Sequence, residues 1–486
     1  MHVSRLALAL AILAPAGPGL IAAIAAQQTD RVEPQTRDEL VDFVMRPTQA
    51  ADEEDVWNPK PAPPPPPLEA PIGPPMAGPT GDEPIGPPLA GPAPQPIEDG
   101  KIRAPRPLET DPFAPVGIKL GSFIIRPAIE VGGIFTDNAR ETPDKESAIG
   151  VVFAPEIAVV SEDERYRFEA DARAEIISYD KEEFDENTAA ARAKYRYDLS
   201  SLTSINVDAG YQHFLESFTD PDTPSAAAER PGVNEFDATL GVEQRFGPFS
   251  ARLSGFANRE IHDEVQLAGG GTASLEELNN TEFGGRLRFG YATNATLRPF
   301  VEAAVGGRAF DESRDDSGFA RDGVWGELRG GLVVERGDKL SGEISLGFHH
   351  EDLEDDRLED LDVLLANAAL LWSPQRLSEV RVDLSTEIDP TTTPDVSASV
   401  VYAGTLTLSH SFTPRVRGEV GFSVSHEHEI GGDFRELILT GFTGASYAFN
   451  RVASIEARYT YQRTDRTAPD ENFDEHEVGV RLRLQR

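Results

Sequence analysis

Apolar and polar side chains alternate with a period of two through most of residues 117–486. Successive side chains of a β-strand point to opposite faces, so this period is typical of strands with one apolar and one charged face. In residues 165–176, one face would carry Tyr166, Phe168, Ala170, Ala172, Ala174 and Ile176, and the other Arg165, Arg167, Glu169, Asp171, Arg173 and Glu175. About eighteen such segments, each roughly 10 to 15 residues long, can be placed before the C-terminus.

Short and long connections take turns between these segments. Short polar links such as 199–203, 246–249 and 412–415 alternate with longer ones such as 218–233, 266–280, 312–321 and 353–360. The sequence therefore predicts a meander of hairpins with short turns at one rim and long loops at the other.

The length and number of the segments separate a soluble sheet from a membrane barrel. Strands of globular proteins usually have about 5 to 6 residues, whereas a tilted strand needs about 9 to 11 to cross a bilayer. About eighteen strands rarely stay in an open sheet, and closure removes exposed edges. The apolar face is rich in Ala, Gly, Val and Tyr, which suits lipid contact better than a bulky soluble core. We therefore predict an all-β fold, a transmembrane antiparallel β-barrel of about 18 strands over residues 117–486.

Residues 1–26 have the pattern of a secretory signal peptide. Arg5 precedes an apolar run, and Ala23-Ile24-Ala25 offers an A-x-A cleavage pattern. An N-terminal membrane anchor is the alternative, but Pro15 and Pro18 interrupt the run. The mature chain is therefore expected to be exported.

Residues 27–116 form a different region, in which 21 prolines lie between Pro59 and Pro115. The segment at 71–79 is nearly duplicated at 84–92. So proline-rich a segment cannot bury enough surface to fold compactly, so we expect a disordered, extended periplasmic tether. It could serve as a recognition motif or as a plain spacer, and residues 35–46 could form one short helix.

Composition excludes several classes of site. The 83 acidic residues outnumber the 45 basic ones, which disfavours charge-driven binding of nucleic acid or anionic lipid. The chain has no cysteine, which excludes disulfides, thiolate metal sites and cysteine nucleophiles.

The charged face of the predicted strands would line the interior of the barrel. A barrel of this size is too wide for side chains to fill and normally encloses water, so charges on its wall would be solvated. Arg192, Lys194 and Arg196 could form a selectivity ladder or could be generic wall charges. The residues predicted to face the lumen are Arg167, Glu169, Asp171, Arg173, Arg192, Lys194, Arg196, Arg381, Asp383, Arg417, Glu419, Glu456, Arg458, Arg481 and Arg483.

The histidines give no strong indication of chemistry. His426 and His428 share one strand face and could bind a metal, but rings at the outer membrane interface are the better interpretation. The acidic loop after His349-His350 could hold Ca²⁺, although it lacks the ligand spacing of an EF-hand. No G-x-S-x-G or H-E-x-x-H motif is present, so we predict no enzyme activity and no catalytic, cofactor-binding or metal-binding residues.

The first predicted strands resemble the outer-membrane β-barrel porin family of Gram-negative bacteria. The resemblance rests on Gly121-Ser122-Phe123, Arg126-Pro127, Phe135, Asp137-Asn138, and a second strand with Pro155 followed by "SEDERYRF". It implies an outer-membrane, pore-like barrel without catalytic residues. The chain departs from the pattern common in outer-membrane proteins by ending in Leu484-Gln485-Arg486 rather than an aromatic residue. Pro127, Pro155 and Pro299 fall inside predicted strands, where we expect bends or bulges near a rim.

Three functions agree with this sequence. The first is a porin-like barrel that gives polar solutes passive passage, the second is a non-conducting barrel that anchors the envelope or displays loops, and the third is a polysaccharide exporter. An exporter would need a continuous cationic track, which the mixed charges disfavour. The expected partners are outer-membrane lipid and lipopolysaccharide, the barrel insertion machinery, and peptidoglycan or a periplasmic protein on the Pro-rich segment, with no nucleic acid.

Overall fold

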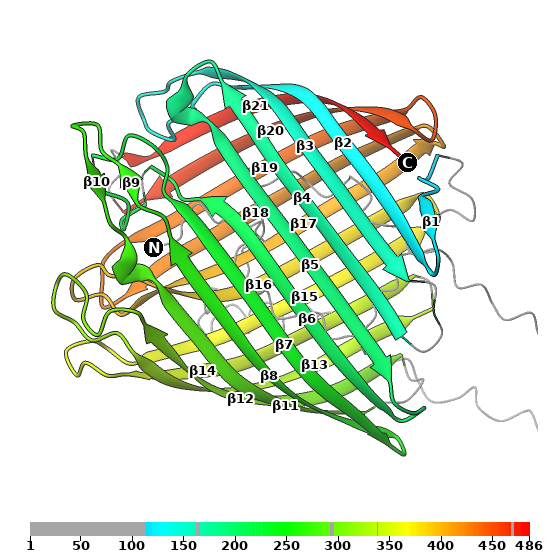
Figure 1. Cartoon of the computed structure of the whole chain (residues 1–486), viewed down its shortest axis with the longest axis horizontal. Coiled ribbons are helices and arrows are strands. Elements are labelled where there is room, and N and C mark those ends of the chain that lie inside the picture. Colours follow the sequence, from blue (N-terminus) through cyan, green and yellow to red (C-terminus); the bar gives the residue numbers. More distant parts are fainter. Residues whose placement is uncertain are drawn as a thin grey trace, which may run out of the picture. The chain divides into compact units, whose positions relative to one another are not determined.

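The computed structural model describes residues 113–486, except for 162, 164–165, 219, 225, 292–295, 338 and 468–470 (Figure 1). The predicted signal peptide and almost all of the predicted Pro-rich tether lie outside the described residues. No helix within the described residues is long and apolar enough to cross a membrane.

Long strands account for most of the described chain. The long strands are β2 (Phe123–Thr136), β3 (Ala148–Ser161), β4 (Tyr166–Tyr179), β5 (Glu186–Asp198), β6 (Thr203–Leu215), β7 (Gly232–Phe246), β8 (Phe249–His262), β11 (Asn280–Tyr291), β12 (Leu297–Phe310), β13 (Gly323–Arg336), β14 (Leu340–Leu353), β15 (Leu361–Gln375), β16 (Ser378–Pro390), β17 (Ala398–Thr413), β18 (Val416–Ile430), β19 (Arg435–Ala448), β20 (Ala453–Arg466) and β21 (Phe473–Gln485). The short elements are β1 (Ile118–Leu120), β9 (Val265–Gln266), β10 (Thr272–Ala273) and the 3₁₀ turns η1 (Glu182–Phe184) and η2 (Glu276–Leu278).

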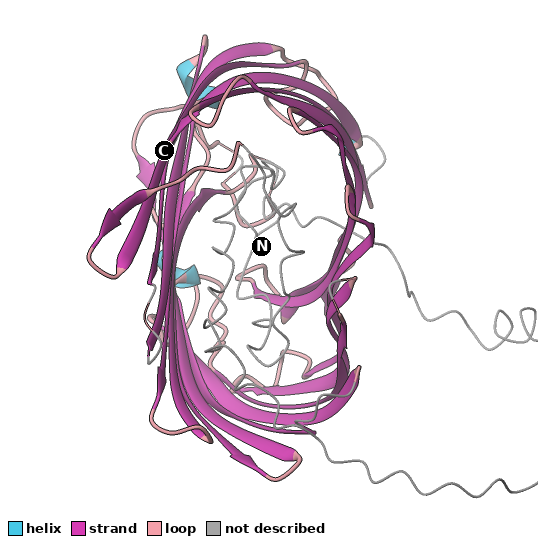
Figure 2. Cartoon of the chain, turned by 90° about the vertical axis from the view of Figure 1, so that its right-hand side faces the viewer, coloured by secondary structure: helices cyan, strands magenta, loops and turns pink. Residues whose placement is uncertain are grey.

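These long strands close into an antiparallel barrel. Each pairs with its neighbour in sequence, β8 pairs with β11, and β2 pairs with β21 from Ala128–Gln485 to Thr136–Glu477. Figure 2 shows the resulting ring of strands. The prediction of an antiparallel barrel with about 18 strands is therefore confirmed. The short turns lie at the rim where β2 begins and β21 ends, and the longer loops lie at the other rim.

The outer surface of the barrel is apolar. Leu253, Val301 and Val305 are 65%, 56% and 67% exposed although they lie within strands. Aromatic side chains collect near the short-turn rim, where the rings of Phe249 and Phe289 stack with centroids 5.4 Å apart. An apolar band edged by aromatic rings is typical of a barrel that spans a membrane.

The three strand prolines differ from one another in position. Pro127 and Pro299 lie near the short-turn rim, as expected, and pair in register with Ile157 and Leu332. Pro155 lies in the middle of β3, so its predicted place near a rim is wrong. The β3–β4 ladder lacks pairs at Ala154 and Pro155 but resumes in the same register, because proline removes a donor without adding a residue. The expected bulge is therefore absent from this ladder.

A charged side chain introduced into the apolar band should destabilise the barrel more, the closer it lies to the middle of the membrane. We expect Leu253→Arg, at the middle of the apolar face of β8, to lower the free energy of unfolding by about 2–4 kcal/mol. Leu297→Arg, at the first residue of β12, should cost about 0–1 kcal/mol because an interfacial arginine reaches water. Denaturant titration of both variants in lipid vesicles measures the difference. Equal costs at the two depths would contradict a lipid-facing outer surface.

Candidate functional site

The inner face of the barrel carries charged side chains opposite the exposed apolar ones. Glu243, Glu302 and Arg288 are only 1%, 4% and 7% exposed, whereas their strand neighbours Val242, Val301 and Phe289 are among the exposed apolar residues. The alternating apolar and charged residues of the sequence thus lie on opposite faces of the barrel wall, the apolar ones outside and the charged ones inside. The inner face carries these charged side chains on many strands, and it is the candidate functional site.

Six of these charges form a closed network where the first and last strands meet. Arg483 of β21 lies 2.7 Å from Glu130 of β2 and 2.8 Å from Glu156 of β3. Arg481 lies 2.7 Å from Glu175 of β4, and Arg173 lies 3.1 Å from both Glu130 and Glu175. We call Arg173, Arg481, Arg483, Glu130, Glu156 and Glu175 the seam network. It joins four strands by ion pairs in addition to their backbone ladders.

Glu130 and Glu156 are part of this network but are not among the residues predicted to face the lumen. Each is the one acidic residue of an otherwise apolar stretch, "PAIEVGG" for Glu130 and "FAPEIAVV" for Glu156. Both residues occupy positions that the alternating pattern assigns to the polar face, and this was the one sequence signal that could have predicted them. Their shared partner Arg483 lies more than three hundred residues away in β21, which only the closed ring brings near.

The basic residues of β5 are matched by carboxylates. Arg192 lies 2.6 Å from Asp208 and 3.2 Å from Asp237, and Lys194 lies 3.9 Å from Asp208. Arg196 lies 3.1 Å from Asp198 and 3.7 Å from Glu243. The three side chains therefore do not present an uncompensated basic ladder.

The other predicted lumen residues lie at the following positions. Glu169 and Asp171 stand opposite Lys194 and Arg192 in the β4–β5 ladder, while the exposed Arg167 stands opposite Arg196. Arg381 lies 2.8 Å from Asp383, Arg458 lies 3.4 Å from Glu419, Glu456 stands opposite Arg481, and Arg417 stands opposite Ser446. That these side chains line a path for solutes stays a prediction.

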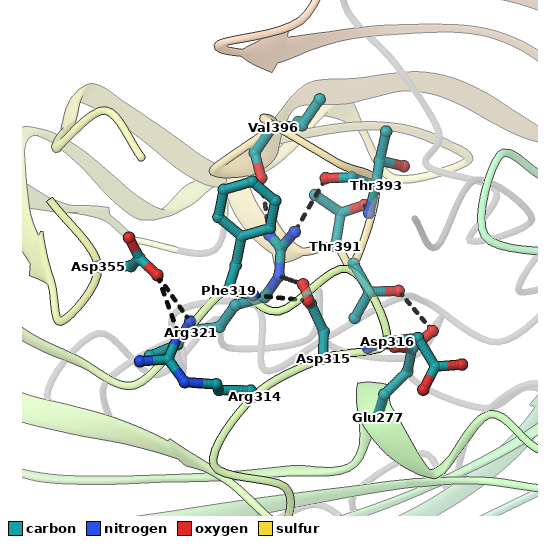
Figure 3. A network of polar contacts seen from close by, with 12 residues as sticks. Glu277, Arg314, Asp315, Asp316, Phe319, Arg321, Asp355, Thr391, Thr393 and Val396 are labelled. Carbon is teal, nitrogen blue, oxygen red and sulfur yellow. Dashed lines mark hydrogen bonds and ion pairs between the residues drawn. The ribbon is translucent and has the colours of Figure 1, made fainter. Parts of the chain in front are cut away.

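A second polar network joins the long loops at the other rim, and no pattern in the sequence predicted it. Arg321 of the β12–β13 loop lies 2.6 Å from Asp315 and donates to the carbonyl oxygens of Val396 (2.7 Å) and Thr393 (2.9 Å) in the β16–β17 loop (Figure 3). The side chains of Arg321 and Asp315 are 4% and 1% exposed. This buried ion pair therefore fixes one loop against another.

The same β16–β17 loop reaches towards the far side of the barrel. Thr391 and Thr393 donate from Oγ1 to Oδ1 of Asp222, in the β6–β7 loop, at 3.1 and 3.3 Å. The two hairpins are separated on one side of the ring by β8, β11, β12, β13, β14 and β15. Thr392 also lies 3.3 Å from Glu277 of η2. The contacts thus bridge the mouth of the barrel.

A neighbouring acidic residue on the loops is held charged. A hydrogen bond from Arg357, at 2.6 Å, lowers the pKa of Asp355 below its ordinary value. Arg314 lies 3.6 Å from the same carboxylate. Asp355 is therefore ionised at neutral pH and joins two basic side chains of adjacent loops.

The histidines make ring contacts and also lie near carboxylates. The rings of His426 and His428 stack with centroids 5.8 Å apart, and His428 stacks on Tyr402 at 6.0 Å. His350 lies 2.9 Å from Asp362, and His349 lies 3.4 Å from Glu351. Across the described part of the chain, no group of three or more His, Asp or Glu residues is arranged to hold a metal ion.

Comparison with known proteins identifies one family. The model of the family described as "Putative beta-barrel porin 2" matches residues 111–486. A comparison with curated proteins finds no relative.

Several solved outer-membrane proteins are distantly similar to the chain. The outer membrane protein opdK from Pseudomonas aeruginosa is 11% identical, with a TM-score of 0.37 over 74% of this chain and 99% of that chain. OccK2 (OpdF) from Pseudomonas aeruginosa, in complex with glucuronate, is 11% identical, with a TM-score of 0.40 over 75% and 99%. The siderophore receptor PirA from Pseudomonas aeruginosa is 7% identical, with a TM-score of 0.37 over 74% and 80%.

The seam network should contribute measurably to stability. Glu130 is 4% exposed and lies near three arginines, so Glu130→Ala leaves buried positive charge uncompensated. We expect a loss of about 3 kcal/mol in the free energy of unfolding. Urea titration of the folded barrel in detergent measures this loss.

The matched control is Arg463→Ala, which breaks an ion pair with Asp465 whose side chains are 45% and 35% exposed. An exposed pair contributes about 0–1 kcal/mol, so this variant should unfold nearly as the parent does. A loss from Glu130→Ala no greater than that from the control would show that the seam network does not stabilise closure.

Proposed function

The chain belongs to the β-barrel porin family whose model spans residues 111–486, and from this we propose that it gives polar solutes passive passage across the outer membrane. The path is the interior of the barrel, and the charged inner faces of the strands are its wall. The short-turn rim faces the periplasm, as is usual for such barrels, and the Pro-rich segment extends from that rim as a tether. Lipid and lipopolysaccharide contact the apolar outer band.

The observation that best supports this proposal is the difference between the two faces of each strand, one apolar and exposed, the other charged. Hydrocarbon suits side chains such as Leu253 and Val305, but ion pairs such as Arg192–Asp208 need a polar surrounding. A ring of this many strands is too wide for side chains to fill, which supports a watery interior.

The balance of charge favours cations among the solutes. Acidic residues outnumber basic ones by 83 to 45 in the chain, and the inner arginines that lie in the seam network and on β5 are each matched by carboxylates. A wall with surplus carboxylates attracts cations and repels anions. The same pairing disfavours an exporter of acidic polysaccharide, which would need a run of free positive charge.

A second candidate is a closed barrel that displays its loops without conducting. The contacts that bridge the mouth, between the β16–β17 loop and Asp222, Glu277 and Arg321, favour this alternative. Recordings across planar lipid bilayers separate the two candidates. Discrete conductance steps support passage, and persistent electrical silence of correctly folded protein supports the closed barrel.

We expect the channel to be cation-selective, with a selectivity that depends on the inner carboxylates. In a KCl gradient, the reversal potential of the parent should have the sign of K⁺ preference. Asp208→Asn leaves Arg192 and Lys194 with less compensation, and should move the reversal potential towards Cl⁻.

Asp362→Asn is the matched control because it removes the same charge from an exposed side chain that alternates with the inner-facing Leu361 and Val363. It should leave the reversal potential unchanged. Equal shifts of the reversal potential in both variants, or no shift in Asp208→Asn, would show that the charged inner face does not determine the ion selectivity.

A further inference from the structure

The ladder between β15 and β16 stops half-way along the two strands. Their paired residues run from Trp372–Val380 to Ala368–Leu384, with one further pair at Gln375–Ser378. Residues 361–367 of β15 continue to pair with β14, and residues 385–390 of β16 continue to pair with β17. The barrel wall is therefore split between β15 and β16 on the long-loop side.

Side chains take the place of the missing ladder bonds. Thr386 Oγ1 accepts from the amide of Ala366 at 2.9 Å and donates to its carbonyl oxygen at 3.2 Å. Tyr402 Oη of β17 donates to the carbonyl oxygen of Leu364 at 3.2 Å. Buried backbone groups need partners, so these bonds stabilise a separated edge.

The two sides of the split overlap as layers. Leu361, Val363 and Leu365 are buried on the face of β15 opposite the exposed Leu364, and they pack against Ala398 and Val400 of β17. Val400 shares a strand face with Leu406 and Leu408, which are exposed on the outside of the barrel. The apolar outer face of the β17 tip thus packs on the inner face of β15, so the tip lies inward of the wall.

The tip nevertheless keeps the side-chain pattern of a wall strand. Ile388, Val400 and Tyr402 would face lipid if the β15–β16 ladder were complete, while Glu387 and Asp389 would face inward. Lipid tails are about as apolar as the side chains that now cover this face, so either position suits it. A segment that suits two packings can switch between them when a few contacts change.

Loop contacts hold the tip in its inward position. Arg321, anchored on Asp315, donates to two carbonyl oxygens of residues 393–396, and Asp222 accepts from the threonine hydroxyls of the same loop. The bonds from Arg321 are charge-assisted, which makes them stronger than neutral ones, and the bond to Val396 is buried. Arg321 therefore acts as the latch.

We propose that residues 385–403, the tip of the β16–β17 hairpin, are a movable flap in the barrel wall. With the latch closed, the flap lies inward and its loop bridges the mouth of the barrel. When Arg321 releases the loop, the flap joins the wall and the ladder extends in register through Ala366–Thr386 and Leu364–Ile388. The mouth is then less obstructed. The effect on conduction rests on the proposed passage of solutes, but the movement itself does not.

Disulfide trapping can test this movement without background, because the chain has no cysteine. The probe is the full chain with Leu364→Cys and Ile388→Cys, two positions that come directly opposite only in the extended ladder. We expect slow cross-linking by a mild oxidant in the latched barrel. Adding Arg321→Ala should raise the cross-linking rate roughly tenfold, because the population of the wall position rises.

Three controls make the result specific. The pair Leu370→Cys and Val382→Cys lies in the formed part of the ladder and should cross-link quickly in every background. Arg314→Ala removes a nearby, 61% exposed arginine that does not bind residues 393–396, and should leave the rate of the probe pair unchanged. Asp315→Asn removes the charge that anchors Arg321, so it should raise the cross-linking rate of the probe pair as Arg321→Ala does. Heat-modifiable migration in gels shows that each variant is folded.

The proposal is overturned if the probe pair cross-links no faster in folded Arg321→Ala and Asp315→Asn barrels than in the barrel with the latch intact. It is equally overturned if the probe pair cross-links as fast as the control pair while the latch is intact, or if Arg314→Ala raises the rate as much as Arg321→Ala does. In bilayers, the cross-linked probe should conduct more than its reduced form. Silence of every variant would count against solute passage and leave the cross-linking result standing.

Discussion

The structure depends on the need to pair every backbone amide and carbonyl group within hydrocarbon. Water cannot reach these groups there, so strands can cross a membrane only as a closed ring. Closure makes the pairing of β2 with β21 the critical contact, since it joins strands from the two ends of the described chain. The seam network adds Arg481 and Arg483 to that contact, and the ring therefore closes through both its backbone and its charges.

Closure also determines what the inner charges can do. Each arginine of the seam network lies near more than one carboxylate, so its charge is divided among several partners across neighbouring strands. Such a wall can be polar and wetted without carrying a strong net field of positive sign. In the proposed channel, selectivity would then come from a surplus of carboxylates rather than from a ladder of free basic groups.

Side-chain alternation was sufficient to predict the strands, their number and the polarity of their faces, because the period of two is a local property of the backbone. The partners of Arg483 could not be predicted, since Glu130 and Glu156 come near it only after the ring closes. The loop contacts of Arg321 were missed for the same reason. Pro155 was misplaced because a proline can interrupt a ladder in mid-strand without forming a bulge.

One local signal of the split wall was nevertheless present in the sequence. From Val363 to Trp372 the chain has no charged residue, although every second residue of an ordinary wall strand here would face a polar interior. A strand that is apolar on both faces needs apolar surroundings on both faces. The inner face of β15 is covered by Ala398 and Val400, so the second apolar stripe reflects the inward hairpin tip. Because Thr386 and Tyr402 supply hydrogen bonds to the β15 edge, the split leaves the backbone requirement of the barrel largely met. A wall that must be closed in hydrocarbon can therefore still contain one edge able to rearrange.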